Sequence, residues 1–197
     1  MRVEATDEAR ANRIVLRAFD LPGAGWQAVR APETVAEAVH GDDLLDACLA
    51  GFPDPDVTAS AESDRFTRNM ALAYSVAWLL SSEAAADIAF ATLAHERFAS
   101  AFVTGMAAEV DQGKGAATLL GHVAAPVEGF GARGQSAAHQ ARLTAADASG
   151  VLPIHLDLLA LHQERAVTLV ILADSPDPMP TADVHAVAER LAGRLRV

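Results

Sequence analysis

The sequence predicts an α+β protein in which an antiparallel sheet of about six strands is covered on both faces. In residues 70–80, large apolar side chains alternate with alanine and serine, so one face of this strand can fill a core and the other lets a helix approach closely. In the C-terminal half, four apolar segments follow one another across short polar loops. Such short connections exclude parallel pairing and favour an antiparallel meander.

The composition is typical of one cored domain. The chain has 197 residues, a length that suits a single domain spanning residues 1–197. Since 51% of the residues are hydrophobic and only 5% are aromatic, the core is expected to be packed from small and aliphatic side chains. The formal net charge is -11 and the arginines are scattered, which argues against a nucleic-acid partner held through its phosphates.

Two features bear on the location of the protein. The N-terminal residues contain no apolar stretch of the length of a signal peptide, and no apolar run is long enough for membrane insertion. Cys48 is the only cysteine, and because it shares a helical stripe with Leu45 and Leu49 it is expected to be buried and unbridged. The sequence therefore predicts a cytoplasmic protein, with an exported or cell-envelope location as the alternative if a leader has been removed.

The N-terminal quarter predicts helices separated by turns. Apolar residues recur at helical spacing over residues 6–19, and Pro22 ends this helix. Trp26 begins a short strand candidate, and its ring is expected to anchor the preceding turn against the domain. A helical stretch then opens at Pro32 and stops at the loop of residues 52–55.

The central part of the chain predicts a strand followed by two helices. Period two continues from residue 69 to residue 80, after which Ser81 or Ser82 can cap an alanine-rich helix that runs to about Leu93. A second helix follows, because apolar residues repeat at helical spacing over residues 98–106.

Four strands and a helix are expected in the C-terminal half. The last of these strands is apolar on both faces and is therefore expected to lie centrally in the sheet. Thr181 is expected to cap the final helix, whose apolar residues form one continuous stripe. The expected strands are residues 119–127, 137–145, 151–161 and 166–173.

A glycine-rich segment, residues 129–134, matches the GxGxxG pattern of dinucleotide-binding loops. That interpretation requires a helix directly after the motif, whereas residues 137–145 alternate with period two as a strand would. The motif also falls too late in the chain for the rest of a doubly wound sheet. A hairpin loop is the favoured interpretation, and no cofactor is expected.

Histidine and aspartate residues on the expected strands are candidate ligand-binding residues. If residues 146–150 form the turn, the register brings His139 opposite Asp157, and His155 follows two residues along on the same face. The carboxylate is then expected to raise the pKa of His139. A hydrogen-bonded structural pair is favoured over a functional cluster in a cleft, and His122 joins the group if its strand is the neighbour. The candidate ligand-binding residues are His122, His139, His155, Asp157 and Tyr74, with no catalytic residue and no metal site expected.

The order of several segments resembles a known family. The opening segment of residues 15–26 reads Val-Leu-Arg-Ala-Phe-Asp-Leu-Pro-Gly-Ala-Gly-Trp, and a cysteine-bearing short helix follows at residues 44–49. The strand of residues 71–78, the helix of residues 83–90 and the closing helix that ends at residues 189–195 follow in the family's order. Nearly the whole chain thus resembles the sensor-type domains of actinobacterial lipoproteins and of the extracellular regions of actinobacterial Ser/Thr kinases.

This resemblance implies a PsbP-like fold, a single-domain α/β/α sandwich whose antiparallel sheet has helices on both faces. Members of the family commonly pair the cysteine of the short helix with one in the later helix, but here residues 98–102 contain no cysteine. The family has no fixed catalytic residues, so none carries over.

The functional hypothesis is a non-enzymatic binding or sensor-like module. It would hold a small ligand or a protein partner in a cleft between the sheet and a helical layer. The alternatives are an accessory or scaffold subunit of a protein assembly, and a small enzyme that uses the His–Asp cluster on the sheet.

Overall fold

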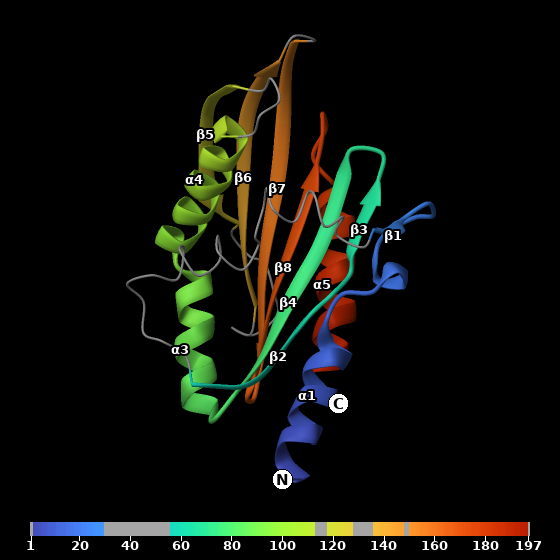
Figure 1. Cartoon of the computed structure of the whole chain (residues 1–197), viewed down its shortest axis with the longest axis vertical. Coiled ribbons are helices and arrows are strands. Elements are labelled where there is room, and N and C mark those ends of the chain that lie inside the picture. Colours follow the sequence, from blue (N-terminus) through green and yellow to red (C-terminus); the bar gives the residue numbers. More distant parts are fainter. Residues whose placement is uncertain (1, 30–55, 113–117, 128–135, 148–149, 197) are drawn as a thin grey trace.

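The computed structural model describes residues 2–29, 56–112, 118–127, 136–147 and 150–196, whose strands form one antiparallel sheet with helices on both faces (Figure 1). The helices are α1 (Arg2–Ile14), α3 (Glu83–Ala94), α4 (Glu96–Gln112) and α5 (Thr181–Leu195), with a 3-10 turn, η1, at Ala18–Asp20. The strands are β1 (Gln27–Val29), β2 (Val57–Glu62), β3 (Arg65–Arg68), β4 (Ala71–Leu80), β5 (Thr118–Pro126), β6 (Ser136–Asp147), β7 (Gly150–Gln163) and β8 (Ala166–Asp174).

The strands follow one another across the sheet in the order β1-β3-β4-β8-β7-β6-β5, and β2 pairs with a further part of β4. The antiparallel meander expected for the C-terminal half is confirmed, and β8 is central as its apolar sequence predicts. The expected number of about six strands is too low, because the described residues form eight. The strand β2 was missed because its side chains are mostly polar and exposed, so it carries no apolar alternation. The extent of the domain, residues 1–197, stays a prediction.

Two helical layers cover the sheet. On one face, which we call the α1/α5 face, Leu16 and Leu191 pack in one apolar cluster with Val170 of β8. On the opposite face, which we call the α3/α4 face, Phe98 and Phe102 of α4 lie in a second cluster with sheet residues. Each such side chain that leaves water contributes on the order of 2 kcal/mol to folding.

The strand β4 separates large from small side chains as its sequence predicts. Ala73 and Ala77 lie fully buried on the α1/α5 face, whereas Tyr74 and Trp78 pack against the cluster of the α3/α4 face. The small residues let the chain leaving α1 approach the sheet closely, and Ser75 Oγ lies on this face to receive it. The two-sided cover of this strand is confirmed.

The first helix ends earlier than its periodicity predicts, at Ile14 rather than at residue 19. The backbone N–H of Leu16 donates to the buried Ser75 Oγ at 2.7 Å, which draws the chain out of the helix and onto the sheet. Asp20 then accepts a hydrogen bond from the backbone N–H of Arg17 at 2.7 Å and closes the turn η1. A long-range partner thus overrides local helix propensity here.

The other helix boundaries follow local rules more closely. Ser82 caps α3, because its side chain accepts from the backbone N–H of Ala85 at 3.2 Å. At α5 the cap residue is Pro180 and makes no side-chain cap bond, so Thr181 is the first helical residue and not the cap that the sequence predicts. The apolar stripe of α5 is buried as expected, and its members are Val184, Val187, Ala188, Leu191 and Leu195.

Some expectations concern residues outside those that the structure describes. They include the buried, unbridged state of Cys48, the helical stretch from Pro32 and the glycine-rich segment of residues 129–134. Within the described ranges, no helix has both the length and the apolar character needed to span a membrane.

Trp26 packs against the apolar cluster of the α1/α5 face beside the turn that it was expected to anchor. Its ring is half-buried, its Nε1 donates to the carbonyl oxygen of Pro22 at 2.9 Å, and the guanidinium of Arg68 lies 4.7 Å from its centroid. Gly23 in this turn has φ +72, and a Cβ there would lie 2.9 Å from the same guanidinium. The turn therefore depends on glycine and on the Trp26–Arg68 stack together.

We expect Trp26→Ala to lower the free energy of unfolding by about 2 kcal/mol, below the roughly 3–5 kcal/mol of a fully buried aromatic residue, because the ring is only half-buried. Trp26→Phe keeps an aromatic ring for Arg68 and loses the hydrogen bond to Pro22, so its cost should be near 1 kcal/mol. Chemical denaturation of the three proteins measures both differences. Equal stability of all three would contradict the anchoring role.

Candidate functional site

Four polar side chains meet on the α1/α5 face of β6 and β7. The register pairs Gln140 with Asp157, and two residues along it pairs Arg142 with His155. Because side chains alternate between the faces of a strand, all four project from the same face. We call this group the polar quartet. It places the Gln140–Asp157 pair, which carries one carboxylate, beside the basic pair of Arg142 and His155.

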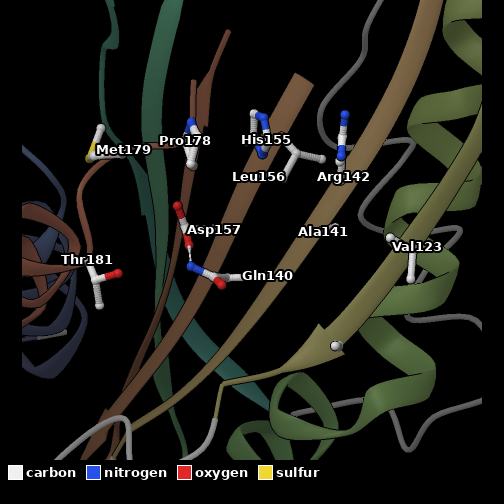
Figure 2. A pocket seen from close by; sticks show the side chains of 11 residues that line it. Val123, Gln140, Ala141, Arg142, His155, Leu156, Asp157, Pro178, Met179 and Thr181 are labelled. Carbon is white, nitrogen blue, oxygen red and sulfur yellow. Dashed lines mark hydrogen bonds between the residues drawn. The ribbon is translucent and has the colours of Figure 1, made fainter. Parts of the chain in front are cut away.

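The polar quartet lines a pocket of about 330 Å³. Figure 2 shows the Gln140 amide directed at the Asp157 carboxylate, with Thr181 to one side of this pair and Val123 to the other. Val123 of β5 and Met179, which precedes α5, add apolar walls. The pocket thus combines apolar surface with a few convergent polar groups, as small-molecule sites commonly do.

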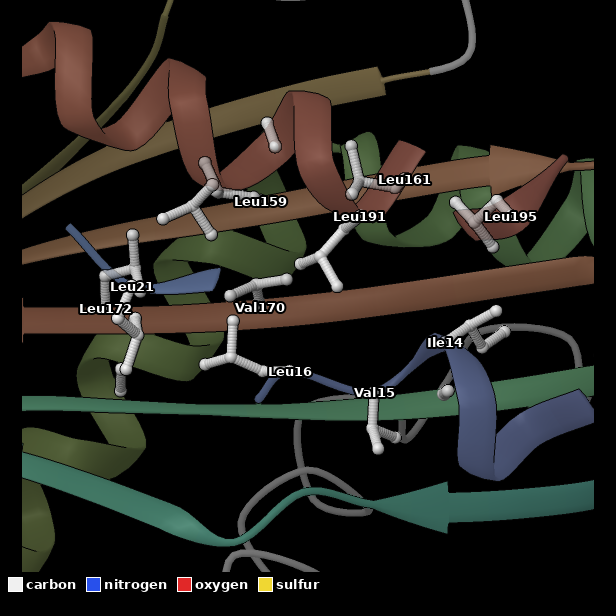
Figure 3. Packing of buried hydrophobic residues seen from close by; sticks show 14 of the residues in the cluster. Ile14, Val15, Leu16, Leu21, Leu159, Leu161, Val170, Leu172, Leu191 and Leu195 are labelled. Carbon is white, nitrogen blue, oxygen red and sulfur yellow. The ribbon is translucent and has the colours of Figure 1, made fainter. Parts of the chain in front are cut away.

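The pocket is open because α5 packs on the central strands of this face and leaves the pocket uncovered. Leu191 and Leu195 of α5 share one apolar cluster with Leu159, Leu161 and Val170 of the central strands, and Figure 3 shows Leu191 between Leu161 and Val170. The strand β5 forms an edge of the sheet, two strands away from β7, and its residue Val123 is 62% exposed. The pocket lies where the sheet extends past the first residue of α5.

The Asp157 side chain is 4% exposed, and its Oδ1 accepts a hydrogen bond from Gln140 Nε2 at 2.9 Å. Burial raises the pKa of the Asp157 carboxyl, while the Gln140 hydrogen bond and the nearby His155 oppose the rise. Among the described residues, no cationic side chain lies within ion-pair distance of this carboxylate. A buried carboxylate with one donor is only partly compensated.

The basic pair is held differently at its two positions. His155 Nε2 lies 3.0 Å from the carbonyl oxygen of Pro176, which ties the segment before α5 to β7. Ser175 Oγ adds a second tie by donating to the carbonyl oxygen of Pro153 at 2.7 Å. Arg142 is exposed, and the structure shows no hydrogen bond or ion pair between its guanidinium and another described residue. The Arg142 guanidinium is therefore available to a ligand.

His139 is not opposite Asp157, and the expected register is wrong by one residue. The pairing runs from Asp147 with Gly150, so only two residues separate the paired ends and His139 pairs with Leu158. A slip of one residue moves a side chain to the other face of the sheet. His139 therefore lies on the α3/α4 face, away from the polar quartet, and the enzyme hypothesis loses its His139–Asp157 pair.

The environment of His139 also reverses the expected direction of its pKa. The side chain is 3% exposed, and its Nε2 lies 3.0 Å from the carbonyl oxygen of Ala94 at the end of α3. Burial lowers the pKa of His139 below its usual 6.5, although the carbonyl contacts at Ala94 and Leu93 oppose this. This histidine acts as a structural contact between the sheet and α3.

The two remaining candidates are His122 and Tyr74. His122 lies on β5, the neighbour of β6 as the sequence allows, and pairs with Leu143 in the register. Tyr74 lies on the α3/α4 face, with the Arg65 guanidinium 5.7 Å from its ring centroid. Of the candidates whose side chains the structure describes, His155 and Asp157 are the two that line this pocket together.

Gln140 and Arg142 were not among the residues predicted from the sequence. A signal for them exists, because each strand has two polar residues spaced two apart, at positions 140 and 142 and at positions 155 and 157. Two such pairs on adjacent antiparallel strands can coincide on one face, but only the register decides whether they do. In the ranges that the structure describes, no three histidine, cysteine, aspartate or glutamate side chains are grouped as metal ligands would be.

These features define an α+β protein with a large antiparallel sheet, helices on both faces and an open pocket on one of them. The crystal structure of the extracellular domain of PknH from Mycobacterium tuberculosis is similar, with a TM-score of 0.50 over 96% of this chain and 96% of that one, at 13% sequence identity. No protein-family model and no curated protein sequence matches the chain. The similarity establishes the shared fold, in agreement with the sensor-type domains that the sequence resembles.

We expect Asp157→Asn to stabilise the unliganded protein at neutral pH. Because the pKa of Asp157 is higher in the folded chain than in the unfolded chain, the charged carboxylate lowers the free energy of unfolding at neutral pH. Asparagine is uncharged and can still accept from Gln140. The gain in melting temperature should be largest at neutral pH and fade as the pH falls toward 3.8, where the unfolded chain also becomes protonated. The exposed change Asp64→Asn should show no such gain, and a loss of stability in Asp157→Asn would contradict this account.

His139 should make the protein sensitive to mild acid. Because the fold holds the pKa of His139 below 6.5, its contribution is complete above pH 6.5 and is lost as the pH falls through that value toward the lower pKa of the folded state. His139→Gln keeps an N–H donor for Ala94 and cannot titrate in this range. Denaturation at a series of pH values should show the unmodified chain losing stability relative to this variant below pH 6.5. Parallel curves for the two proteins would refute the assignment.

Proposed function

We propose that this chain is a non-enzymatic binding or sensor-like module that holds a small ligand in the pocket between β5, β6, β7 and the start of α5. The observation that carries the proposal is the polar quartet on the uncovered part of the α1/α5 face. Burying the Asp157 carboxylate costs stability, so its presence beside an open pocket with three further polar side chains is typical of a binding site.

The fold supports a sensing role by analogy, which is a weaker argument than the site itself. The PknH domain of similar structure is extracellular. This favours the exported or cell-envelope location over the cytoplasmic one that the sequence predicts, and we include it in the proposal. We also retain the PsbP-like α/β/α sandwich as the finer description of the fold, since helices cover both faces of the sheet.

The pocket can be tested by obstructing its rim. We expect saturable shifts of the backbone amide signals of β5, β6 and β7 when small molecules from a diverse library are titrated into the labelled protein and followed by NMR. Val123→Trp places a bulky ring at an exposed position of the pocket wall and should abolish these shifts without unfolding the protein.

Leu120→Trp is the matched control, because Leu120 lies on the same strand, is 60% exposed and does not line the pocket. It should bind as the unmodified chain does. Binding that survives Val123→Trp, or a library without any compound that shifts these amides, would overturn the proposed function.

A further inference from the structure

The polar quartet has opposite charges at its two ends, and these charges do not neutralise each other. Arg142 and Asp157 are diagonal neighbours on adjacent strands, a spacing of about 7–8 Å between Cα atoms that a long side chain can bridge. The structure nevertheless shows no ion pair between them. Both side chains line the pocket instead. A ligand between them can therefore contact both.

The acidic end of the pocket requires a hydrogen-bond donor. Asp157 is 4% exposed, and its Oδ1 accepts a hydrogen bond of 2.9 Å from the neutral Gln140 amide. A carboxylate has about four acceptor positions, and leaving them unmet in a buried place is costly. A protonated amine is the ligand group that meets this need with both charge and several N–H donors.

The basic end of the pocket requires an acceptor with negative charge. The Arg142 guanidinium has five donors in a planar fork that matches a carboxylate, and no described residue uses them. His155 lies opposite Arg142 in the register and adds an imidazole ring at this end. The groups beyond the quartet, Val123, Ala125 and Met179, are apolar and suit an uncharged aliphatic body.

We propose that the pocket binds a zwitterion of the amino-acid type, with its ammonium group at Asp157, its carboxylate at Arg142 and an aliphatic side chain against the apolar walls. This proposal rests on the proposed binding function and names the class of its ligand. It assigns Gln140 a positioning role, since the amide holds the Asp157 carboxylate on the side of Oδ1 and leaves the other oxygen to the ligand.

The test compares three compounds that share the leucine side chain and differ in which charged groups they keep. L-Leucine carries both charges, L-leucine methyl ester keeps only the ammonium group and N-acetyl-L-leucine keeps only the carboxylate. L-Valine and L-methionine with the same derivatives cover other aliphatic bodies. NMR titration of the full chain at neutral pH should show that each free amino acid that binds does so at least tenfold more tightly than either of its derivatives.

Two variants assign the ends of the ligand. In Asp157→Asn the free amino acid and its N-acetyl derivative should bind with similar affinity, because the partner of the ammonium group has lost its charge. In Arg142→Gln the free amino acid and its methyl ester should become similar for the same reason at the other end. The exposed changes Asp64→Asn and Arg13→Gln are charge-matched controls and should retain the tenfold preference.

Each other outcome overturns a defined part of the argument. If a derivative binds as tightly as its free amino acid, or if the variants leave the preference unchanged, the zwitterion assignment is wrong while the pocket remains a binding site. If no amino acid binds but other library compounds bind in a manner that Val123→Trp abolishes, the ligand class is again wrong and the proposed function stands. If no compound binds at the pocket, both fall.

Discussion

The continuous antiparallel pairing of β6 with β7 determines which side chains share a face of this protein. The register runs without interruption from Ser136 with Leu161 to Asp147 with Gly150. Because side chains alternate along both strands, this register places the polar quartet on the α1/α5 face and His139 among apolar neighbours on the α3/α4 face. A slip of β6 by one residue against β7 would turn Arg142 toward the α3/α4 face and expose Leu143 to the pocket, so the apolar core itself selects the register.

The helices cover the α1/α5 face only in part, and the polar quartet lines the pocket on the part that they leave uncovered. The cluster around Leu159, Val170 and Leu191 closes the α1/α5 face over the central strands, whereas the part of that face on β5 and β6 stays open. Asp157 lies at the boundary, buried enough for its pKa to rise and still part of the pocket wall. The free energy that this charge costs the unliganded fold is available to strengthen the binding of a ligand that neutralises it.

The similarity to the PknH extracellular domain at 13% identity shows how little of the fold depends on particular residues. The sheet and its helical layers require apolar side chains of suitable size at alternating positions, and many sequences satisfy that requirement. A pocket lined by Gln140, Arg142, His155 and Asp157 depends on individual side chains. The function of this chain must therefore be established from its own pocket and not from the fold.

Several properties were determined by the sequence by itself, because they depend on residues close together in the chain. Alternation along β4 predicted a strand covered on two sides, Ser82 predicted the start of α3, and short loops predicted antiparallel pairing. Other properties depend on residues far apart, and only the tertiary structure decided them. The end of α1 is set by the hydrogen bond from Leu16 to Ser75, and the polar quartet exists because a two-residue connection brings Asp147 opposite Gly150. Local patterns are compatible with either register, and the burial of apolar side chains across the whole sheet is the energy that chooses between them.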